Sequence, residues 1–243
     1  MSRLESYSQF GEDREIVAHF PERYLGYFVE VGANNGVRDS NTLLLEKCGW
    51  SGILIEANAE LADEASRMRP NARVVQTVVG SGKQSVVRFL TVSKPGSNLD
   101  GLSSVALSPE VMKQIEDCGG AINSSEIPCR CLDDILSENL SRRQKVDFVS
   151  IDVEGAEMDV LRGFNLTFYL PRLVMIEDNS KGADVNVPHY MKSQGYARVH
   201  RTGWNDWYVP RIERSGFSFR SVVLQFRLLK WAVERSVKNA LPR

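Results

Sequence analysis

The sequence has few of the features that mark secreted, metal-binding or membrane proteins. Its four cysteines show no paired C-x-x-C spacing, and its three scattered histidines suggest no zinc site. No apolar run approaches the ~20 residues of a membrane span. The first residues, MSRLESYSQFGEDRE, are polar and charged, so we expect no secretory leader and a cytoplasmic protein with reduced thiols.

The bulk composition is that of an ordinary globular protein, but its charge is unevenly distributed. Hydrophobic residues make up 42% of the 243 positions and charged residues 25%, which fits one large domain with an appendage. Residues 211–243 carry eight Lys or Arg and two Asp or Glu, a net +6, so the preceding residues carry −7. We therefore predict one domain over 1–210 and a basic tail over 211–243.

The stretch YFVEVGANNG at positions 27–36 is the most informative in the chain. An apolar run ends in Glu30, a glycine-containing turn follows, and a second apolar run ends in Glu56. This order predicts strand, tight turn, helix and strand, with two carboxylates at the strand ends of a nucleotide-binding crevice. Taken alone, the motif also fits an ordinary strand–turn–helix with no ligand.

The turn lacks the G-x-G-x-x-G spacing that a dinucleotide requires, because three residues separate Gly32 from Gly36. Glu56 is placed to accept hydrogen bonds from both hydroxyls of a ribose, and Glu30 suits a cationic amine. A ligand with a ribose and an amine but no diphosphate fits better than NAD. S-adenosylmethionine is such a ligand, and a nicotinamide oxidoreductase is the weaker alternative.

Apolar strand-like runs alternate with helix-like segments along the rest of the domain. This alternation predicts an α/β fold, with a mostly parallel sheet covered by helices on both faces. The expected strands are 28–31, 52–56, 73–79, 147–153, 173–177 and a closing hairpin of 196–200 with 207–209, and the expected helices are 39–49, 59–69, 157–164 and 187–194. Residues 85–92 are expected to form a further strand by hairpin.

Residues 94–128 interrupt this alternation. The segment is rich in Gly, Ser, Asn and Asp around one short helical piece at 109–117. A long irregular excursion inside a compact domain is typical of a lid, a substrate loop or disorder. All three interpretations remain open at this point.

Three acids follow or end apolar strands on what should be the same rim of the sheet. They are Asp152 and Glu154 in S-I-D-V-E-G, and Glu177 in M-I-E-D-N. Acids at the carboxyl ends of parallel strands can orient a cationic ligand, take a proton from a hydroxyl, or hold a metal. Glu154 could instead cap the following helix. Asp152 lies within an apolar run, where an acid is costly without a task or partner.

Several long motifs, in order, resemble the FkbM-type methyltransferases, which use S-adenosylmethionine and mostly O-methylate sugars and related hydroxyls. The resemblance covers about residues 6–210. Its marks are S-Q-F-G-E-D (8–13), F-V-E-V-G-A-N-N-G (28–36), D-S-N-T (39–42), W-S-G-I-L-I-E-A-N (50–58), G-L-S-S (101–104), L-D-D (132–134) and D-F-V-S-I-D-V-E-G-A-E (147–157). It implies the Rossmann-like class I methyltransferase fold. Cys131 departs from the threonine expected before L-D-D.

The resemblance also implies roles for particular residues. Expected cofactor contacts are Glu30, Gly32, Asn34, Gly36, Asn41, Glu56, Asn58 and Asp152. Asp152 and Glu154 should face the methyl-transfer centre, with Asp152 the first candidate base and His189 a weaker one. Ser103, Ser104, Glu177 and Trp204 are expected at the acceptor. No metal is predicted. Trp207 and Tyr208 are expected to pack the last hairpin rather than bind a sugar.

The fold could also serve a catalytically silent binding module that uses its basic tail, although acids at every strand end favour an enzyme. From Phe219 to Val237 apolar residues recur at steps of three and four, with basic residues mostly opposite. This spacing predicts a C-terminal amphipathic helix. It could pack on the domain, on a second subunit, or on the anionic inner face of a membrane.

Overall fold

The computed structural model describes residues 5–94, 96–97, 99–141, 144–180 and 182–211. Its main sheet contains seven strands in the order β3-β2-β1-β7-β8-β10-β9. They are β1 (Tyr27–Val31), β2 (Ser51–Glu56), β3 (Ala72–Gln76), β7 (Phe148–Ile151), β8 (Leu173–Glu177), β9 (Tyr196–Thr202) and β10 (Asn205–Pro210). The first five in spatial order are parallel, and β10 is antiparallel to both β8 and β9. The predicted α/β sheet is confirmed, including its closing hairpin.

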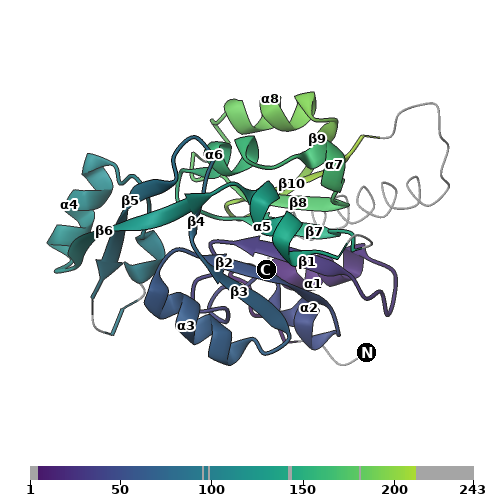
Figure 1. Ribbon diagram of the computed structural model, residues 1–243, viewed down its shortest axis with the longest axis horizontal. Coiled ribbons are helices and arrows are strands. Elements are labelled where there is room, and N and C mark those ends of the chain that lie inside the picture. The colour runs from purple at the N-terminus through teal and green to yellow at the C-terminus, as the bar shows by residue number, and fades with distance from the viewer. Residues whose placement is uncertain (1–4, 95, 98, 142–143, 181, 212–243) are drawn as a thin grey trace, which may run out of the picture.

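Helices cover both faces of this sheet because its strands carry apolar residues on alternating sides (Figure 1). One face packs against α5 (Leu132–Asn139), α6 (Glu157–Arg162), α7 (Leu166–Tyr169) and α8 (Asn186–Ser193). The other packs against α1 (Glu12–His19), α2 (Leu43–Lys47) and α3 (Ala59–Met68). Trp207 and Tyr208 are each 1% exposed and belong to opposite faces, so the prediction that they pack the hairpin is confirmed.

A small second sheet lies beyond the carboxyl ends of the main strands, at the left of Figure 1. It has the order β4-β6-β5, from β4 (Val78–Val79), β5 (Val86–Ser93) and β6 (Ala121–Arg130). The predicted strand at 85–92 is confirmed as β5, but its hairpin pairing is wrong. This strand pairs along its whole length with β6, from Val86 opposite Pro128 to Ser93 opposite Ala121. Likewise the third strand does not continue to Val79, since β4 leaves it to pair with β6.

The segment 94–128 is more regular than its composition suggests. It contains a short 3₁₀ turn, η1 (Leu99–Leu102), the predicted helix α4 (Pro109–Asp117), and most of β6. Ser108 caps α4 by accepting a hydrogen bond from the Val111 N–H. The described part of this segment is therefore an ordered side wall of the domain rather than an irregular loop.

The S-Q-F-G-E-D motif fixes the start of α1 to the start of β10, where Asn205 lies opposite Glu177. Asp13 accepts hydrogen bonds from the Ser6 and Ser8 hydroxyls and from the Tyr7 N–H. Glu12 accepts one from the Asn205 side chain at the start of β10. These acids are fully buried and engaged, so they serve the fold. No described helix is long and apolar enough to cross a membrane. The predicted basic helix of residues 211–243 lies, beyond Arg211, outside the described residues.

Candidate active site

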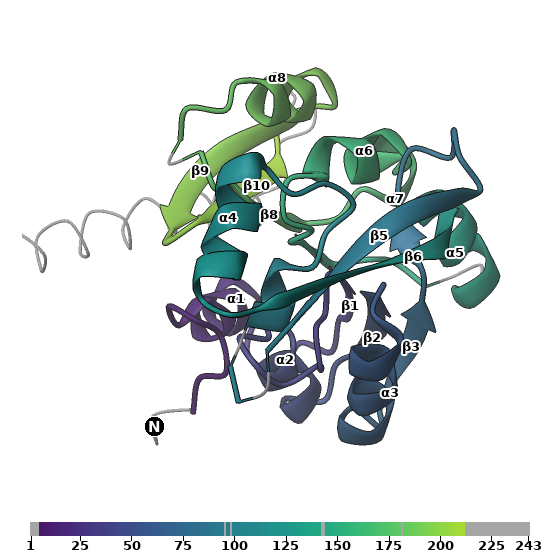
Figure 2. The ribbon, with the colours of Figure 1, turned by 90° about the vertical axis from the view of Figure 1, so that its left-hand side faces the viewer.

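A cavity of about 570 Å³ lies at the carboxyl ends of β1, β2, β7 and β8. Figure 2 views the molecule from the side of the small sheet, with β5 and β6 in front of the main sheet. This volume lies within the ~300–1,000 Å³ usual for small-molecule sites. The small sheet, η1 and α4 form its opposite wall, through residues such as Phe89, Leu102 and Val111. The predicted ligand-binding rim and the described cavity coincide.

Gly32 begins the glycine turn and brings β1 into contact with β7. It has φ of +83°, and a Cβ at this position would lie 1.7 Å from the Asp152 carbonyl oxygen. Any side chain here would therefore force the two strand ends apart. The amides of Gly32 and Ala33 both donate to the Ile55 carbonyl, at 2.9 and 3.1 Å. The glycine thus holds the carboxyl ends of three neighbouring strands, β1, β2 and β7, in register around the cavity.

Glu56 closes this turn from the end of β2. Its two carboxylate oxygens accept hydrogen bonds from the Asn34 and Asn58 N–H groups, each at 2.8 Å. Burial raises the pKa of Glu56, and these hydrogen bonds act in the opposite direction by favouring the charged form. A carboxylate oxygen has two lone-pair sites, so each can accept one more donor. Glu56 lines the cavity, and this capacity suits the two hydroxyls of a ribose.

Glu30 lines the cavity but is deeply buried, with 4% of its surface exposed. Its carboxylate accepts from the Asn41 N–H at 2.9 Å and from the Thr42 hydroxyl at 2.6 Å, and it lies 3.9 Å from the Arg69 guanidinium. The D-S-N-T motif is therefore explained as the set of donors for Glu30. The sequence predicted that the Glu30 carboxylate suits a cationic amine of the ligand. In the structure this carboxylate already interacts with Asn41, Thr42 and Arg69.

Arg69 is a buried residue at the centre of this region that the sequence interpretation missed. It is fully buried, and its guanidinium contacts Glu46 at 2.5 Å, the Gly36 carbonyl at 2.7 Å and the Thr42 hydroxyl at 2.9 Å. In the sequence it stands directly before Pro70 and carries only the signal of a helix end. No local pattern reveals that the residue is buried.

Three of the residues predicted to contact the cofactor pack against or hydrogen-bond to other parts of the protein. Gly36 does not line the cavity; a Cβ there would lie 2.8 Å from the Arg69 side chain, so its role is to let the turn approach α3. The Asn58 side chain caps α3 by accepting from Glu60 and Leu61, and it also lies outside the lining. Asn41 does line the cavity, and its amide donates to Ser150 at 3.2 Å. Gly36 and Asn58 therefore have clear roles in the scaffold, and their expected contacts with the cofactor remain predictions.

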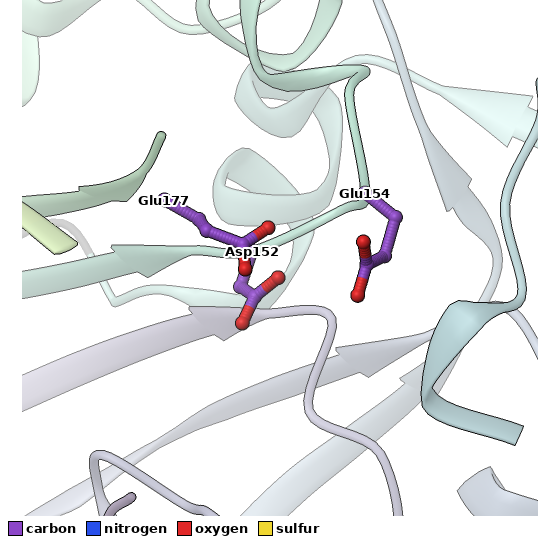
Figure 3. A group of neighbouring side chains, drawn as sticks. All are labelled: Asp152, Glu154 and Glu177. Atoms are coloured by element: carbon purple, nitrogen blue, oxygen red, sulfur yellow. The ribbon is translucent and has the colours of Figure 1, made fainter. Parts of the chain in front are cut away.

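The three predicted acids of the opposite half come together. Asp152, Glu154 and Glu177 point toward one another in Figure 3, and an oxygen from each lies within 4.8 Å of the others. All three line the cavity. Asn179 donates to Glu177 at 2.9 Å and to Glu154 at 3.3 Å. Within the described part of the chain, no Lys or Arg forms an ion pair with any of the three.

Burial, and after it the crowding of the three carboxylates, sets the protonation of this cluster. Burial, followed by the charges of Asp152 and Glu154, raises the pKa of Glu177 far above its usual range, so Glu177 holds a proton at neutral pH. Burial raises the pKa of Asp152 only to about 6, because a hydrogen bond with Glu177 favours its charged form. Burial and the Asp152 charge raise the pKa of Glu154 to about 7. Asp152 is therefore the acid best able to accept a proton near neutral pH.

The remaining predicted residues divide between the cavity and the scaffold. Trp204 is 37% exposed and lines the cavity, as does Ser103. The Ser104 hydroxyl is buried and donates to the Glu154 carbonyl, so it is not available to an acceptor. His189 lies exposed on α8, outside the cavity lining, with Nδ1 3.0 Å from the Val185 carbonyl oxygen. The structure does not bring His189 to the three acids, so its predicted role as a base has no support from its position.

The lining also contains an ion pair that the sequence did not suggest. Arg38 donates to Asp100 at 2.6 Å and to the Asn34 side chain at 2.9 Å. It thereby joins the glycine turn to η1, whose last two residues are the first two of the G-L-S-S motif. In the sequence, Arg38 stands between two of the family motifs, but nothing near it indicates that it pairs with Asp100, 62 residues away.

Comparison with known proteins assigns the family. The model of the methyltransferase FkbM domain matches residues 30–197, more than half of the chain. The chain belongs to the FkbM family of S-adenosylmethionine-dependent methyltransferases. The matched range runs from Glu30 at the cavity floor to the start of β9, so it contains the glycine turn, the small sheet and the three acids. No curated protein matches the chain.

Several solved methyltransferases are similar in structure at low sequence identity. Methyltransferase FkbM from Methylobacillus flagellatus KT has 16% identity and a TM-score of 0.49, over 76% of this chain and 43% of that one. A TehB-like SAM-dependent methyltransferase from Corynebacterium glutamicum has 12% identity and a TM-score of 0.43, over 84% and 89%. A SAM-dependent methyltransferase from Thiobacillus denitrificans, solved with S-adenosyl-L-homocysteine, has 10% identity and a TM-score of 0.39, over 82% and 68%.

Proposed function

We propose that this protein transfers a methyl group from S-adenosylmethionine to a hydroxyl of a sugar, a glycan or a related secondary metabolite. The observation that carries the proposal is the division of one cavity into two halves. In the glycine-turn half, Glu56 offers a carboxylate that suits a ribose. In the half formed by residues 152–177, Asp152 offers a carboxylate beside a protonated Glu177. One half suits the cofactor and the other suits an acceptor that must lose a proton.

The residues present fit the cofactor. The second lone-pair sites of Glu56 suit the ribose hydroxyls, and Gly32 keeps the backbone of the turn close to β7. When bound, S-adenosylmethionine supplies an electrophilic methyl group on a positively charged sulfur. The acidic lining of the cavity favours that charge.

Asp152 then serves as the general base. Its carboxylate accepts the proton that the acceptor hydroxyl must lose, while Glu177, already protonated, orients it by sharing a hydrogen bond. Positioning the acceptor is the larger part of the task, since in-line transfer depends on alignment. Trp204 offers an exposed ring at the same edge of the cavity, which suits the apolar face of a sugar.

The charge of the cavity limits the acceptor. Seven acids line it, whereas Arg38 is its single basic lining residue among those described and is paired with Asp100. A phosphate or carboxylate next to the reacting hydroxyl would be repelled. We therefore favour a neutral or amine-bearing sugar.

The test combines cofactor binding with an acceptor panel. The protein is incubated with methyl-labelled S-adenosylmethionine and neutral sugars, amino sugars and sugar phosphates, and products are read by mass spectrometry, beside glycans from cells lacking the gene. Transfer to neutral or amino sugars is expected. Cofactor binding without transfer to any acceptor would favour the silent binding module, and transfer to sugar phosphates alone would contradict the charge argument. Activity that survives EDTA would favour Asp152 as a base over a metal-assisted route.

A further inference from the structure

Glu154 stands in a backbone conformation that few glutamates adopt. Its φ is +54°, in the left-handed region, and Gly155 follows with φ of +99°. Non-glycine residues other than Asn, Asp and His rarely occupy this region, so the surrounding structure must hold Glu154 there. The conformation matters because it turns the strand after β7 and directs the Glu154 side chain toward Asp152 and Glu177 (Figure 3).

One side chain from a distant part of the chain bonds to this turn. The Ser104 hydroxyl donates to the Glu154 carbonyl oxygen at 3.0 Å. Ser104 is 2% exposed, and its own backbone is fixed to β5 by two hydrogen bonds with Leu90, at 2.8 and 3.1 Å. The Ser104 hydroxyl is therefore rigidly placed, and its burial keeps it from contacting a methyl-accepting substrate in the cavity.

The same segment is tied at its other end to the cofactor half of the cavity. Asp100, four residues before Ser104, pairs with Arg38, which also bonds to Asn34 in the glycine turn. The Ser103 hydroxyl donates to the Asp100 carbonyl at 2.7 Å and accepts from the Val92 N–H at 3.0 Å. Residues 100–104 therefore bridge the glycine turn and the acid cluster.

We propose that Ser104 is a positioning residue for the methyl-transfer reaction, acting through Glu154. Glu157 accepts hydrogen bonds from the Val153 and Gly155 N–H groups, at 3.3 and 3.0 Å, and the Ser104 hydroxyl adds the bond to the Glu154 carbonyl. Together these bonds hold the left-handed turn that places the Glu154 carboxylate beside Asp152 and Glu177. This inference rests on the proposed function, because it assigns the G-L-S-S motif to the acid half of the same site. It replaces direct acceptor binding as the role of Ser104.

The first test measures the turn itself and needs no acceptor. Backbone NMR chemical shifts of Glu154 and Gly155 report φ and are compared in wild type, Ser104→Ala and Ser104→Thr. We expect Ser104→Ala to move the Glu154 shifts away from left-handed values and Ser104→Thr, which keeps the hydroxyl, to preserve them. Unchanged shifts in a folded Ser104→Ala protein would overturn the proposal even if the enzyme has no identified acceptor, so this failure differs from failure of the proposed function.

The second test uses turnover with an acceptor found by the panel. Loss of one net hydrogen bond should lower kcat roughly tenfold in Ser104→Ala, with little change in the KM for cofactor. Ser104→Thr should recover most of the rate. Ser137→Ala is the matched control, because Ser137 also donates to a backbone carbonyl, that of Asp134 at 2.9 Å, but lies on α5 outside the cavity.

A double-mutant cycle separates positioning from general stability. If Ser104 acts through Glu154, Ser104→Ala should cost little further kcat in a Glu154→Gln background. Additive losses, or a lower melting temperature with unchanged kcat, would overturn the proposal. Should Ser104→Ala not fold, Ser104→Cys retains the volume with a weaker donor, and the same comparisons apply.

Discussion

The two halves of the cavity treat their acids in opposite ways. In the glycine-turn half, Glu30 and Glu56 are almost fully buried, and each accepts two or more hydrogen bonds from backbone N–H groups or a hydroxyl. In the 152–177 half, oxygens of three carboxylates lie within 4.8 Å of one another, and Asn179 donates to two of them, Glu154 and Glu177. Burial raises the pKa of the acids in both halves. Hydrogen-bond donors oppose this shift at Glu30 and Glu56, whereas neighbouring carboxylates add to it in the 152–177 half. We infer that the first half binds and the second reacts.

The largest expected effect comes from breaking the contact between the halves. Gly32→Ala would place a Cβ 1.7 Å from the Asp152 carbonyl oxygen, on backbone that has little freedom to move. We expect a loss of more than about 4 kcal/mol in the free energy of unfolding, or no soluble protein.

Gly155→Ala is the control for Gly32→Ala. Gly155 also has positive φ, +99°, but a Cβ there would meet nothing within 4 Å. Its cost should be limited to backbone strain, about 1–3 kcal/mol. Urea unfolding measures both, and equal losses would contradict the steric argument.

Asp152→Asn should greatly reduce methyl transfer without weakening cofactor binding. The variant keeps the shape of the side chain and removes its ability to take a proton, so turnover should fall by at least ~10²-fold. Circular dichroism and the melting temperature establish that the protein is folded. Normal turnover with the same acceptor would remove Asp152 from the mechanism.

The pH dependence of the rate sharpens the same distinction. The folded pKa of Asp152 is raised to about 6, so the base is protonated and inactive below that value. We expect kcat/KM to fall about tenfold per pH unit on the acidic side of pH 6. The binding constant for S-adenosylhomocysteine should change less over that range. A rate that stays level down to pH 5 would exclude an acid with this raised pKa.

Glu56→Ala should affect binding alone. Removing a charged acceptor should weaken cofactor affinity by ~1.5–3 kcal/mol, or about 10- to 150-fold. Calorimetry with S-adenosylhomocysteine measures the change, and Glu60→Ala, on the exposed side of α3, is the matched control. An unchanged affinity in a folded Glu56→Ala protein would end the ribose assignment.

The smallest effect is expected outside both halves. Cys131 occupies the N-cap of α5 but accepts no capping hydrogen bond there. Cys131→Thr supplies an oxygen acceptor and should raise stability by about 0.5–1 kcal/mol without changing binding or turnover. A change in cofactor affinity or in kcat would show that the site extends beyond the two halves described.

The sequence predicted the parts of the fold that local patterns encode. Apolar runs predicted β1, β2, β7 and β8, and the acids that follow or end them fell on one rim because parallel strands share a direction. The pairing of β5 with β6 was not predictable, since 27 intervening residues separate Ser93 from Ala121 and no turn signal links them.

The sequence indicated which acids line the candidate site, but not which residues contact them. Asp152, Glu154, Glu177 and Glu56 were identified because an acid after an apolar run is conspicuous. Arg69 and the Arg38–Asp100 pair were missed because their partners are distant in the chain. Ser104 and Asn58 were placed in the site by the family resemblance, yet their hydrogen bonds support other residues.

The most direct test of the division into binding and reacting halves measures two variants in the same two assays. Glu56→Ala and Asp152→Asn are each titrated with S-adenosylhomocysteine and assayed for methyl transfer at saturating S-adenosylmethionine. We predict that Glu56→Ala loses affinity and retains kcat within a few-fold, whereas Asp152→Asn retains affinity and loses at least ~10²-fold in kcat. Parallel losses of affinity and kcat in both variants would contradict the division.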